Sequence, residues 1–265
     1  MKDKKLAVIT GASSGIGKSF AYILASRGYD LMLIARRKTL LVNHASSLHK
    51  RYNVDVKVYD VDLSIGIQRK KLLSSLHKKT ESIDLLVNNA GLGRFGEAVS
   101  IGVEDTNKMI EVNVVALTEF CLSLIPLVLK SNQKSIINVA SVAAFHPSAF
   151  AAVYAATKAY VYSFSMALAS EYNGRISILA LCPGITDTEF WQSSGVSKPK
   201  YLIRSADTVV EQALENLTKK VLIIGVENKI RVIIQKFIPD SFMLYVGRAV
   251  RTFIQNTKTK KINNW

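Results

Sequence analysis

The chain has 265 residues, enough for one α/β domain, and its 49% of hydrophobic residues excludes a disordered or fibrous protein. Lysine and arginine outnumber aspartate and glutamate by 35 to 20. The net charge of +15 indicates an anionic partner (a phosphorylated small molecule, an anionic membrane surface or a nucleic acid) or, alternatively, only a basic proteome background. Two scattered cysteines give no disulfide framework, so a reducing compartment is expected.

Short β-rich runs alternate with longer stretches of helical apolar spacing. We predict strands over residues 5–10, 30–35, 54–59, 83–87, 135–140, 175–182 and 221–225. We predict helices over residues 15–28, 39–51, 65–80, 104–130 (kinked near Pro126), 150–172 and 207–220. This alternation predicts an α/β fold with a single Rossmann-type, doubly wound parallel sheet of about seven strands. Ligands bind such sheets at the carboxyl ends of the strands.

Two segments bear on membranes and targeting. The first residues do not resemble a signal peptide, because the apolar run is short and ends in a glycine. Residues 135–157 carry no charged side chain and are long enough to span a bilayer. Their polar residues, Asn138, Ser141 and His146 among them, favour a strand, a loop and the start of a helix.

A glycine-rich loop follows the first predicted strand and opens directly into a helix. Its spacing is G-x-x-x-G-x-G, which lets the backbone approach a pyrophosphate at a helix N-terminus. The cofactor contacts expected from this loop are Gly11, Ser13, Ser14, Gly15, Ile16 and Gly17.

Two arginines, Arg36 and Arg37, stand at the end of the second strand, where dinucleotide-binding proteins commonly place an acidic residue for the ribose. Guanidinium groups pair with a 2′-phosphate, so this position favours NADP(H) over NAD. The alternative is that one or both arginines only solvate the start of the next helix.

A candidate acid/base group lies on the helix predicted over residues 150–172. Tyr154 and Lys158 are four residues apart and share one helix face, and Ser141 closes the preceding strand. A nearby ammonium lowers the pKa of a phenol and makes it usable near neutral pH. By itself, however, a tyrosine four residues before a lysine is common in helices.

Taken together, the motifs resemble the short-chain dehydrogenase/reductase family. They are TGASSGIG at 10–17, DVDL at 60–63, NNAG at 88–91, Asn113, Ser141, the Tyr154/Lys158 pair and CPG at 182–184, so the resemblance covers residues 5 to about 190. It implies an NADP-dependent oxidoreductase, here a ketone reductase or alcohol dehydrogenase.

The resemblance also implies catalytic roles. Tyr154 would transfer the proton of the substrate oxygen, and Ser141 would align that oxygen. Lys158 would bind the nicotinamide ribose and lower the pKa of Tyr154, and Asn113 would anchor a water in a proton relay. Because all four are present, an active enzyme is favoured over a non-catalytic NADP-binding regulator.

Further cofactor contacts are implied beyond the glycine loop and the arginines. Tyr154 and Lys158 would also contact the cofactor. The adenine would be held by Asp62 and Leu63, and the adenosine ribose by Asn89, Ala90 and Gly91. The nicotinamide side would be covered by Pro183, Gly184 and Thr188. The family often has valine where this chain has Leu63.

The chain is predicted to divide at residue 225. Residues 1–225 would form the oxidoreductase domain, with a substrate lid at 185–205 whose Phe190, Trp191 and Tyr201 suit an apolar substrate or, alternatively, belong to the core. Residues 226–265 would form a basic amphipathic helical extension broken at Pro239, which could lie on an anionic membrane, a partner subunit or the domain itself.

The partners follow from these assignments. We expect a small-molecule carbonyl or alcohol substrate, a homodimer or homotetramer formed through the helices at 104–130 and 150–172, and a cytoplasmic protein with peripheral membrane contact as one option. No metal is expected, because the four histidines form no ligand pattern. No nucleic acid is expected, because the positive charge is spread over many helices and no recognition motif is present.

Overall fold

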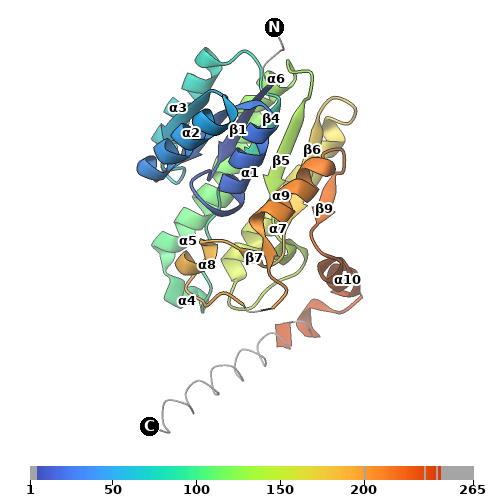
Figure 1. Ribbon diagram of the computed structural model, residues 1–265. Helices are drawn as coiled ribbons and strands as arrows, with labels where there is room; N and C mark the ends of the chain where they lie inside the picture. Colours follow the sequence, from blue (N-terminus) through green and yellow to red (C-terminus); the bar gives the residue numbers. More distant parts are fainter. Residues whose placement is uncertain (1–4, 200, 236, 243, 246–265) are drawn as a thin grey trace.

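A seven-stranded parallel sheet with the order β3-β2-β1-β4-β5-β6-β9 forms the centre of the protein (Figure 1). The computed structural model describes residues 5–199, 201–235, 237–242 and 244–245. The strands are β1 Lys5–Thr10, β2 Tyr29–Ala35, β3 Val56–Asp60, β4 Leu85–Asn88, β5 Ser135–Val139, β6 Ser177–Cys182 and β9 Val221–Ile223. The predicted Rossmann-type parallel sheet is therefore confirmed.

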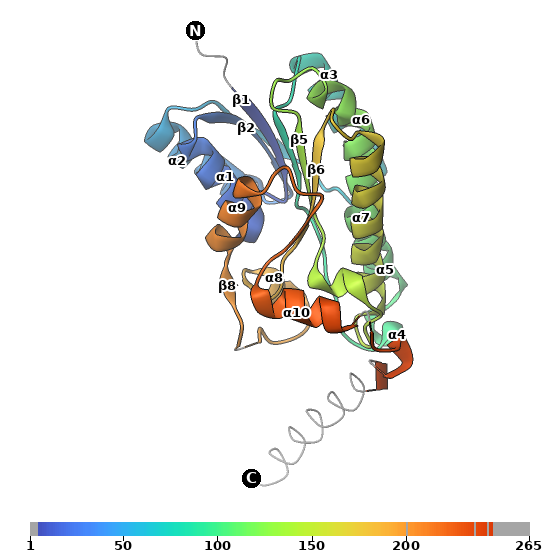
Figure 2. The same ribbon diagram turned by 90° about the vertical axis from the view of Figure 1, so that its right-hand side faces the viewer.

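Helices cover both faces of this sheet (Figure 2). One face carries α1 Gly15–Ser26, α2 Lys38–Tyr52 and α9 Ala206–Glu215, and the other carries α3 Gly66–Lys79, α6 Leu117–Val128 and α7 Ala152–Glu171. Successive strand side chains point to opposite faces, so Ala7 and Ile9 join the first hydrophobic cluster and Val8 joins the second. Burial on both faces explains why the strands other than the edge strand β3 are almost continuously apolar.

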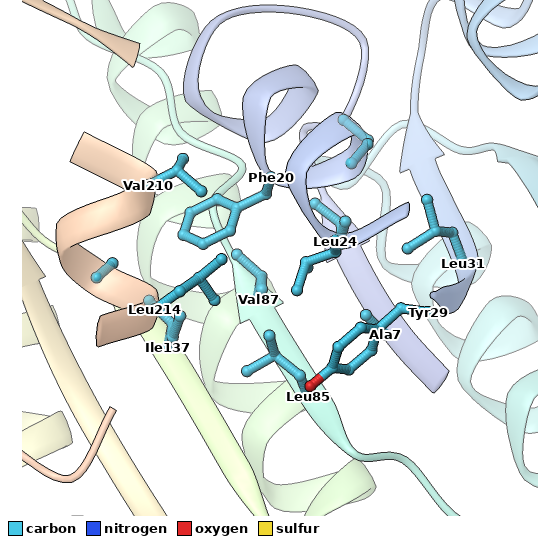
Figure 3. Close-up of a cluster of buried hydrophobic side chains, with 14 of the residues drawn as sticks. Ala7, Phe20, Leu24, Tyr29, Leu31, Leu85, Val87, Ile137, Val210 and Leu214 are labelled. Carbon is cyan, nitrogen blue, oxygen red and sulfur yellow. The ribbon is translucent and has the colours of Figure 1, made fainter. Parts of the chain in front are cut away.

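Helices α1 and α9 lie next to each other although almost 200 residues separate them. In Figure 3, Phe20 and Leu24 of α1 face Val210 and Leu214 of α9 above the strand residue Val87. This packing fixes the start of α1, and with it the glycine loop, against the sheet.

The helix predicted over residues 104–130 is divided. It consists of α5 Val103–Ile110, a π-helical turn η1 Glu111–Ala116 and α6. The irregularity therefore lies around Asn113 and not near Pro126, which stands inside α6 close to its end. By length and composition the helix Val103–Val128 could cross a membrane, but half of its most apolar window is buried, as in a core helix of a globular domain.

Short elements gather at the carboxyl end of the sheet. They are α4 Ala98–Ile101, the 3-10 helix η2 Val142–Phe145, the two-stranded pair β7 Thr186–Asp187 and β8 Arg204–Ser205, α8 Phe190–Ser193 and α10 Val226–Gln235 (Figures 1 and 2). The described parts of the predicted extension are helix α10 and residues 237–242 and 244–245. The prediction for residues 246–265 lies outside the described residues.

Candidate active site

A cavity of about 630 Å³ opens at the carboxyl ends of the strands, a size typical of ligand sites. It runs from Arg36 at the end of β2 to Tyr154 on α7. All predicted cofactor and catalytic residues line this cavity except Gly17 and Asn113.

The glycine loop needs two of its glycines for packing. Gly15 has a positive φ of 52°, and a Cβ there would lie 2.9 Å from Cγ2 of Thr188. A Cβ on Gly17 would lie 2.3 Å from the carbonyl oxygen of Gly11. The structure thus gives Gly17 a packing position beneath the loop, because its side-chain position is filled by the backbone of the loop itself.

The end of β4 holds the glycine loop in place. Asn89 Nδ2 donates to the carbonyl oxygen of Thr10 at 2.9 Å, and the backbone N–H groups of Asn89 and Ala90 donate to Thr10 Oγ1, each at 3.0 Å. The NNAG motif therefore ties two neighbouring strand ends together. The adenosine-ribose contacts expected of Asn89, Ala90 and Gly91 stay predictions.

The two arginines at the end of β2 have different surroundings. Arg37 donates from Nε and Nη2 to Ser13 Oγ at 3.1 and 3.0 Å, and its Nη1 lies 2.6 Å from a carboxylate oxygen of Glu189. Arg36 is more exposed, and its Nη1 lies 3.8 Å from Asp62. Both guanidinium groups border the same end of the cavity.

Asp62 is fixed beside Arg36. Its Oδ1 accepts hydrogen bonds from the backbone N–H and the hydroxyl of Ser64, at 2.9 and 2.7 Å. Desolvation raises the pKa of Asp62, but the Ser64 hydrogen bonds and the charge of Arg36 outweigh it and hold this pKa below its usual value. The carboxylate is thus ionised and available as an acceptor at neutral pH.

The loop containing Leu63 is held from beneath by a buried arginine. Arg69 of α3 donates from Nη1 to the carbonyl oxygen of Leu63 at 2.7 Å. Its guanidinium also pairs with Glu119 of α6 and with Glu111 of η1, each at 2.8 Å. This side chain, which the sequence analysis did not single out, connects the Asp62–Leu63 end of the cavity with the π-helical turn.

Ser141, Tyr154 and Lys158 meet at the opposite end of the cavity. Ser141 lies at the carboxyl end of β5 and caps η2 by accepting a hydrogen bond from the N–H of Ala143 at 3.1 Å. Its side chain also lies close enough to the Tyr154 hydroxyl to lower the pKa of that phenol. Lys158 Nζ donates to the carbonyl oxygen of Val139 at 2.8 Å and lies 6.0 Å from the centre of the Tyr154 ring.

Burial has the largest effect on the pKa values of Tyr154 and Lys158. Desolvation raises the pKa of Tyr154, against an opposing effect of the hydrogen bond to Ser141, and lowers the pKa of Lys158 to about 8. In this structure the Lys158 ammonium donates to Val139 and desolvation outweighs the other effects on the Tyr154 pKa, so the expected lowering of that pKa by Lys158 stays a prediction. Cys182, behind Lys158, is a buried thiol whose pKa is raised by desolvation to about 12, as expected of an inert side chain.

Asn113 lies behind the cavity wall. Its Oδ1 accepts from the backbone N–H of Leu92 at 2.8 Å, and its Nδ2 donates to the Leu92 carbonyl oxygen at 2.9 Å and to Thr157 Oγ1 at 3.0 Å. The side chain thus joins η1 to α7 and to the loop after β4. The π-helical geometry of η1 fits a functional position, since such turns are frequent at functional sites. Water anchoring by Asn113 stays a prediction.

Aromatic rings form one wall beside Tyr154. Phe95 and Phe190 lie 5.3 and 5.7 Å from Tyr154, centre to centre, and Trp191 stacks on Phe95 at 6.2 Å. Of the three aromatic residues predicted for the lid, Phe190 and Trp191 are in this wall, whereas Tyr201 is 81% exposed. Phe95 was missed; its only sequence signal is its place four residues after the NNAG motif.

The sequence of the chain is similar to those of known proteins. Residues 5–198 match the sequence model of the family described as short chain dehydrogenase. An NADP-dependent 3-hydroxy acid dehydrogenase from Schizosaccharomyces pombe is 35% identical over 191 residues, which cover 71% of this chain and 74% of that protein. A very-long-chain 3-oxoacyl-CoA reductase from Rattus norvegicus is 27% identical over 263 residues, covering 95% of this chain and 83% of that protein.

The fold agrees with solved structures as well. A short-chain dehydrogenase from Sphingobium yanoikuyae, solved in complex with NADPH, superimposes with a TM-score of 0.79 at 31% sequence identity. The alignment covers 88% of this chain and 93% of that one.

Proposed function

Since the chain belongs to the short-chain dehydrogenase family, we propose that it is an NADP(H)-dependent oxidoreductase. The reaction would move a hydride between the nicotinamide and a carbonyl or alcohol carbon of an apolar substrate, with Tyr154 as the acid/base. In this scheme the cofactor supplies or accepts the hydride, and the protein provides position and proton transfer.

The observation that carries this proposal is the placement of Tyr154. Its side chain lies beside Ser141 and near Lys158, and it lines the same cavity as the glycine loop. Ser141 would hold the substrate oxygen next to the Tyr154 hydroxyl, and Lys158 would bind the ribose hydroxyls of the cofactor. Asn113 would position the strand-end loop that faces them.

The choice of NADP(H) is supported by charge at the other end of the cavity. Arg36 and Arg37 provide two guanidinium groups beside the glycine loop, and a 2′-phosphate matches their hydrogen-bonding geometry. A relative and a solved structure named above carry NADP or NADPH in their descriptions, which supports the same choice.

The apolar substrate class is supported by the wall of Phe95, Phe190 and Trp191, which would exclude water from the reacting carbon. Two relatives are named for acyl compounds oxygenated at carbon 3. We therefore propose 3-oxoacyl esters and bulky apolar ketones as the first compounds to screen.

The test is a fluorescence titration with NADPH and NADH, followed by an NADPH-consumption assay. Wild type should bind NADPH more tightly than NADH, and Arg36→Ala should remove most of that difference. Tyr154→Phe should keep NADPH binding and lose turnover by about 100-fold or more, the contribution of general acid catalysis. Equal binding of both cofactors would refute the phosphate assignment, and an active Tyr154→Phe variant would refute the acid/base assignment.

We also propose that the protein is a cytoplasmic homo-oligomer with peripheral membrane contact. Ile110, Leu122 and Tyr160 leave exposed apolar surface on α5, α6 and α7, which suits an interface between subunits. Helix α10 exposes a second apolar stripe, formed by Val226, Ile230, Ile233 and Ile234 at helical spacing. Light scattering tests the oligomer. Sedimentation with anionic vesicles tests the membrane contact, which Ile233→Glu should weaken.

A further inference from the structure

The segment between β7 and α8 docks directly on the glycine loop and the end of β2. Thr188 fills the space that a side chain at position 15 would need, since its Cγ2 and Cβ lie 2.9 and 3.0 Å from a Cβ built on Gly15. The next residue, Glu189, pairs with Arg37 across 152 positions of sequence. The start of the predicted lid is thus held by the wall that would bind the cofactor.

Arg37 is clamped between this lid and the glycine loop. Its Nε and Nη2 donate to Ser13 Oγ, and its Nη1 donates to Glu189 at 2.6 Å. A guanidinium group offers its N–H donors in a fixed planar fork that suits one carboxylate or one phosphate per edge. A phosphate arriving at Arg37 would meet a carboxylate already bound there, and the two anions repel each other.

We infer that Glu189 is a specificity-determining residue of the cofactor site, an inference that rests on the proposed function. The Glu189 carboxylate competes with the 2′-phosphate of NADP(H) for Arg37 and so reduces the preference for that cofactor. The 2′-hydroxyl of NAD(H) is neutral and leaves the pair between Arg37 and Glu189 intact. Binding of NADP(H) therefore frees the lid from the end of β2, whereas binding of NAD(H) does not.

The size of the effect follows from exposure. The side chains of Arg37 and Glu189 are 46% and 50% exposed, so water and salt screen the pair. Removing the Glu189 charge should tighten NADPH binding about two- to fivefold, equivalent to about 0.4–1 kcal/mol. The gain should shrink as salt is added, because screening weakens the repulsion that the substitution removes.

The lid offers a matched control. Asp187 stands two residues before Glu189 and pairs with Lys198 at 2.6 Å instead of with a cofactor-site arginine. Glu189→Gln and Asp187→Asn each remove one carboxylate charge from the same segment. Arg37→Ala, alone and combined with Glu189→Gln, completes a double-mutant cycle that isolates the coupling between the two residues.

The experiment measures dissociation constants of NADPH and NADH for the full-length wild type and these variants. A second readout is the fluorescence of Trp191 on the lid, in a background in which Trp265→Phe removes the other of the two tryptophans. We expect Glu189→Gln to bind NADPH more tightly than wild type and NADH equally well, and Asp187→Asn to bind both as wild type does. In the Arg37→Ala background, Glu189→Gln should bring no gain in NADPH affinity. NADPH should change the emission of Trp191, and NADH should not.

The outcomes separate this inference from the proposal beneath it. If wild type prefers NADPH but Glu189→Gln alters neither affinity, or alters both cofactors equally, the inference is wrong and the proposed function stands. The same holds if Asp187→Asn gives the same gain as Glu189→Gln. If wild type binds neither cofactor, the proposed function fails and the inference fails with it.

Discussion

Replacing Gly93 by alanine should damage the substrate side of the cavity and spare the cofactor side. A Cβ at this position would lie 2.2 Å from Cζ and 2.8 Å from Cε2 of Phe190. Carbon atoms in contact stay about 3.5–4.0 Å apart, so the ring must retreat by more than about 1 Å. The clashing atoms lie at the far end of the Phe190 ring, which is on the lid and can move. The loss of stability should therefore be near the lower limit for overpacking, about 1 kcal/mol.

The functional loss should be larger than the loss of stability. Phe190 also contacts Tyr154 and Phe95, and its retreat opens the wall that would cover the substrate. A misfit of about one methylene in an apolar pocket changes transition-state binding by about 1–3 kcal/mol. For a bulky ketone, kcat/KM should therefore fall about 10- to 100-fold in Gly93→Ala, while the dissociation constant of NADPH stays within about twofold of wild type.

Two measurements check this prediction: steady-state NADPH consumption over a range of ketone concentrations, and NADPH titration by fluorescence. Gly66→Ala is the control, because its Cβ would lie at an ordinary contact distance of 3.5 Å from Arg69, away from the cavity. Unchanged kcat/KM in Gly93→Ala, or a parallel loss of NADPH affinity, would refute the reasoning.

Three other buried side chains should respond to substitution or pH. Burial lowers the pKa of Lys158 to about 8, so its charge destabilises the folded state fully below pH 8 and progressively less as the pH rises towards 10.5. Relative to Lys158→Met, wild type should gain about 1 kcal/mol of unfolding free energy between pH 8 and 9 in urea titrations; a constant difference would contradict this. Asn113→Leu leaves the backbone N–H and carbonyl groups of Leu92 without their amide partner. The free energy of unfolding, measured in urea as well, should fall by about 2–4 kcal/mol. A loss near zero would show that the two groups find another partner. Arg69→Met should lower the free energy of unfolding by about 2 kcal/mol. This loss is smaller than that from breaking a fully buried ion pair, because both glutamate partners are 40% exposed, and Arg69→Lys should recover part of it. Equal stability of Arg69→Met and wild type would exclude a stabilising role.

Much of the fold could be predicted from local patterns. Buried parallel strands are short apolar runs, and the helices between them show one apolar face, so alternation alone gave the sheet and its covering helices. The short elements α4, α8, β7 and β8 contain too few residues to show a period. The π-helical turn was also missed, because a helix with one widened turn keeps nearly the same apolar spacing, and the irregularity that Pro126 suggested was placed in α6 instead.

The candidate site was predictable where a motif is contiguous and not where the chain must fold to bring residues together. The glycine loop, and the Tyr154/Lys158 pair on one helix face, are properties of a few adjacent turns. The contact of Phe95 with Trp191 joins residues 96 positions apart, one on the loop after β4 and the other on helix α8. Nothing local marks Phe95, since an isolated phenylalanine in a loop has no pattern that distinguishes a cavity wall from core packing.

The protonation of the site shows why burial must be known before charge is interpreted. A lysine four residues from Tyr154 predicts a lowered phenol pKa, yet desolvation raises that pKa and lowers the pKa of Lys158 to about 8. A phenol that keeps its proton is the acid that carbonyl reduction needs, whereas alcohol oxidation needs the phenolate as a base. Between pH 6 and about pH 7, where Lys158 keeps most of its charge, kcat/KM for reduction should therefore stay constant and kcat/KM for oxidation should rise about tenfold per pH unit. Parallel profiles for the two directions would mean that the proton passes through a group other than Tyr154.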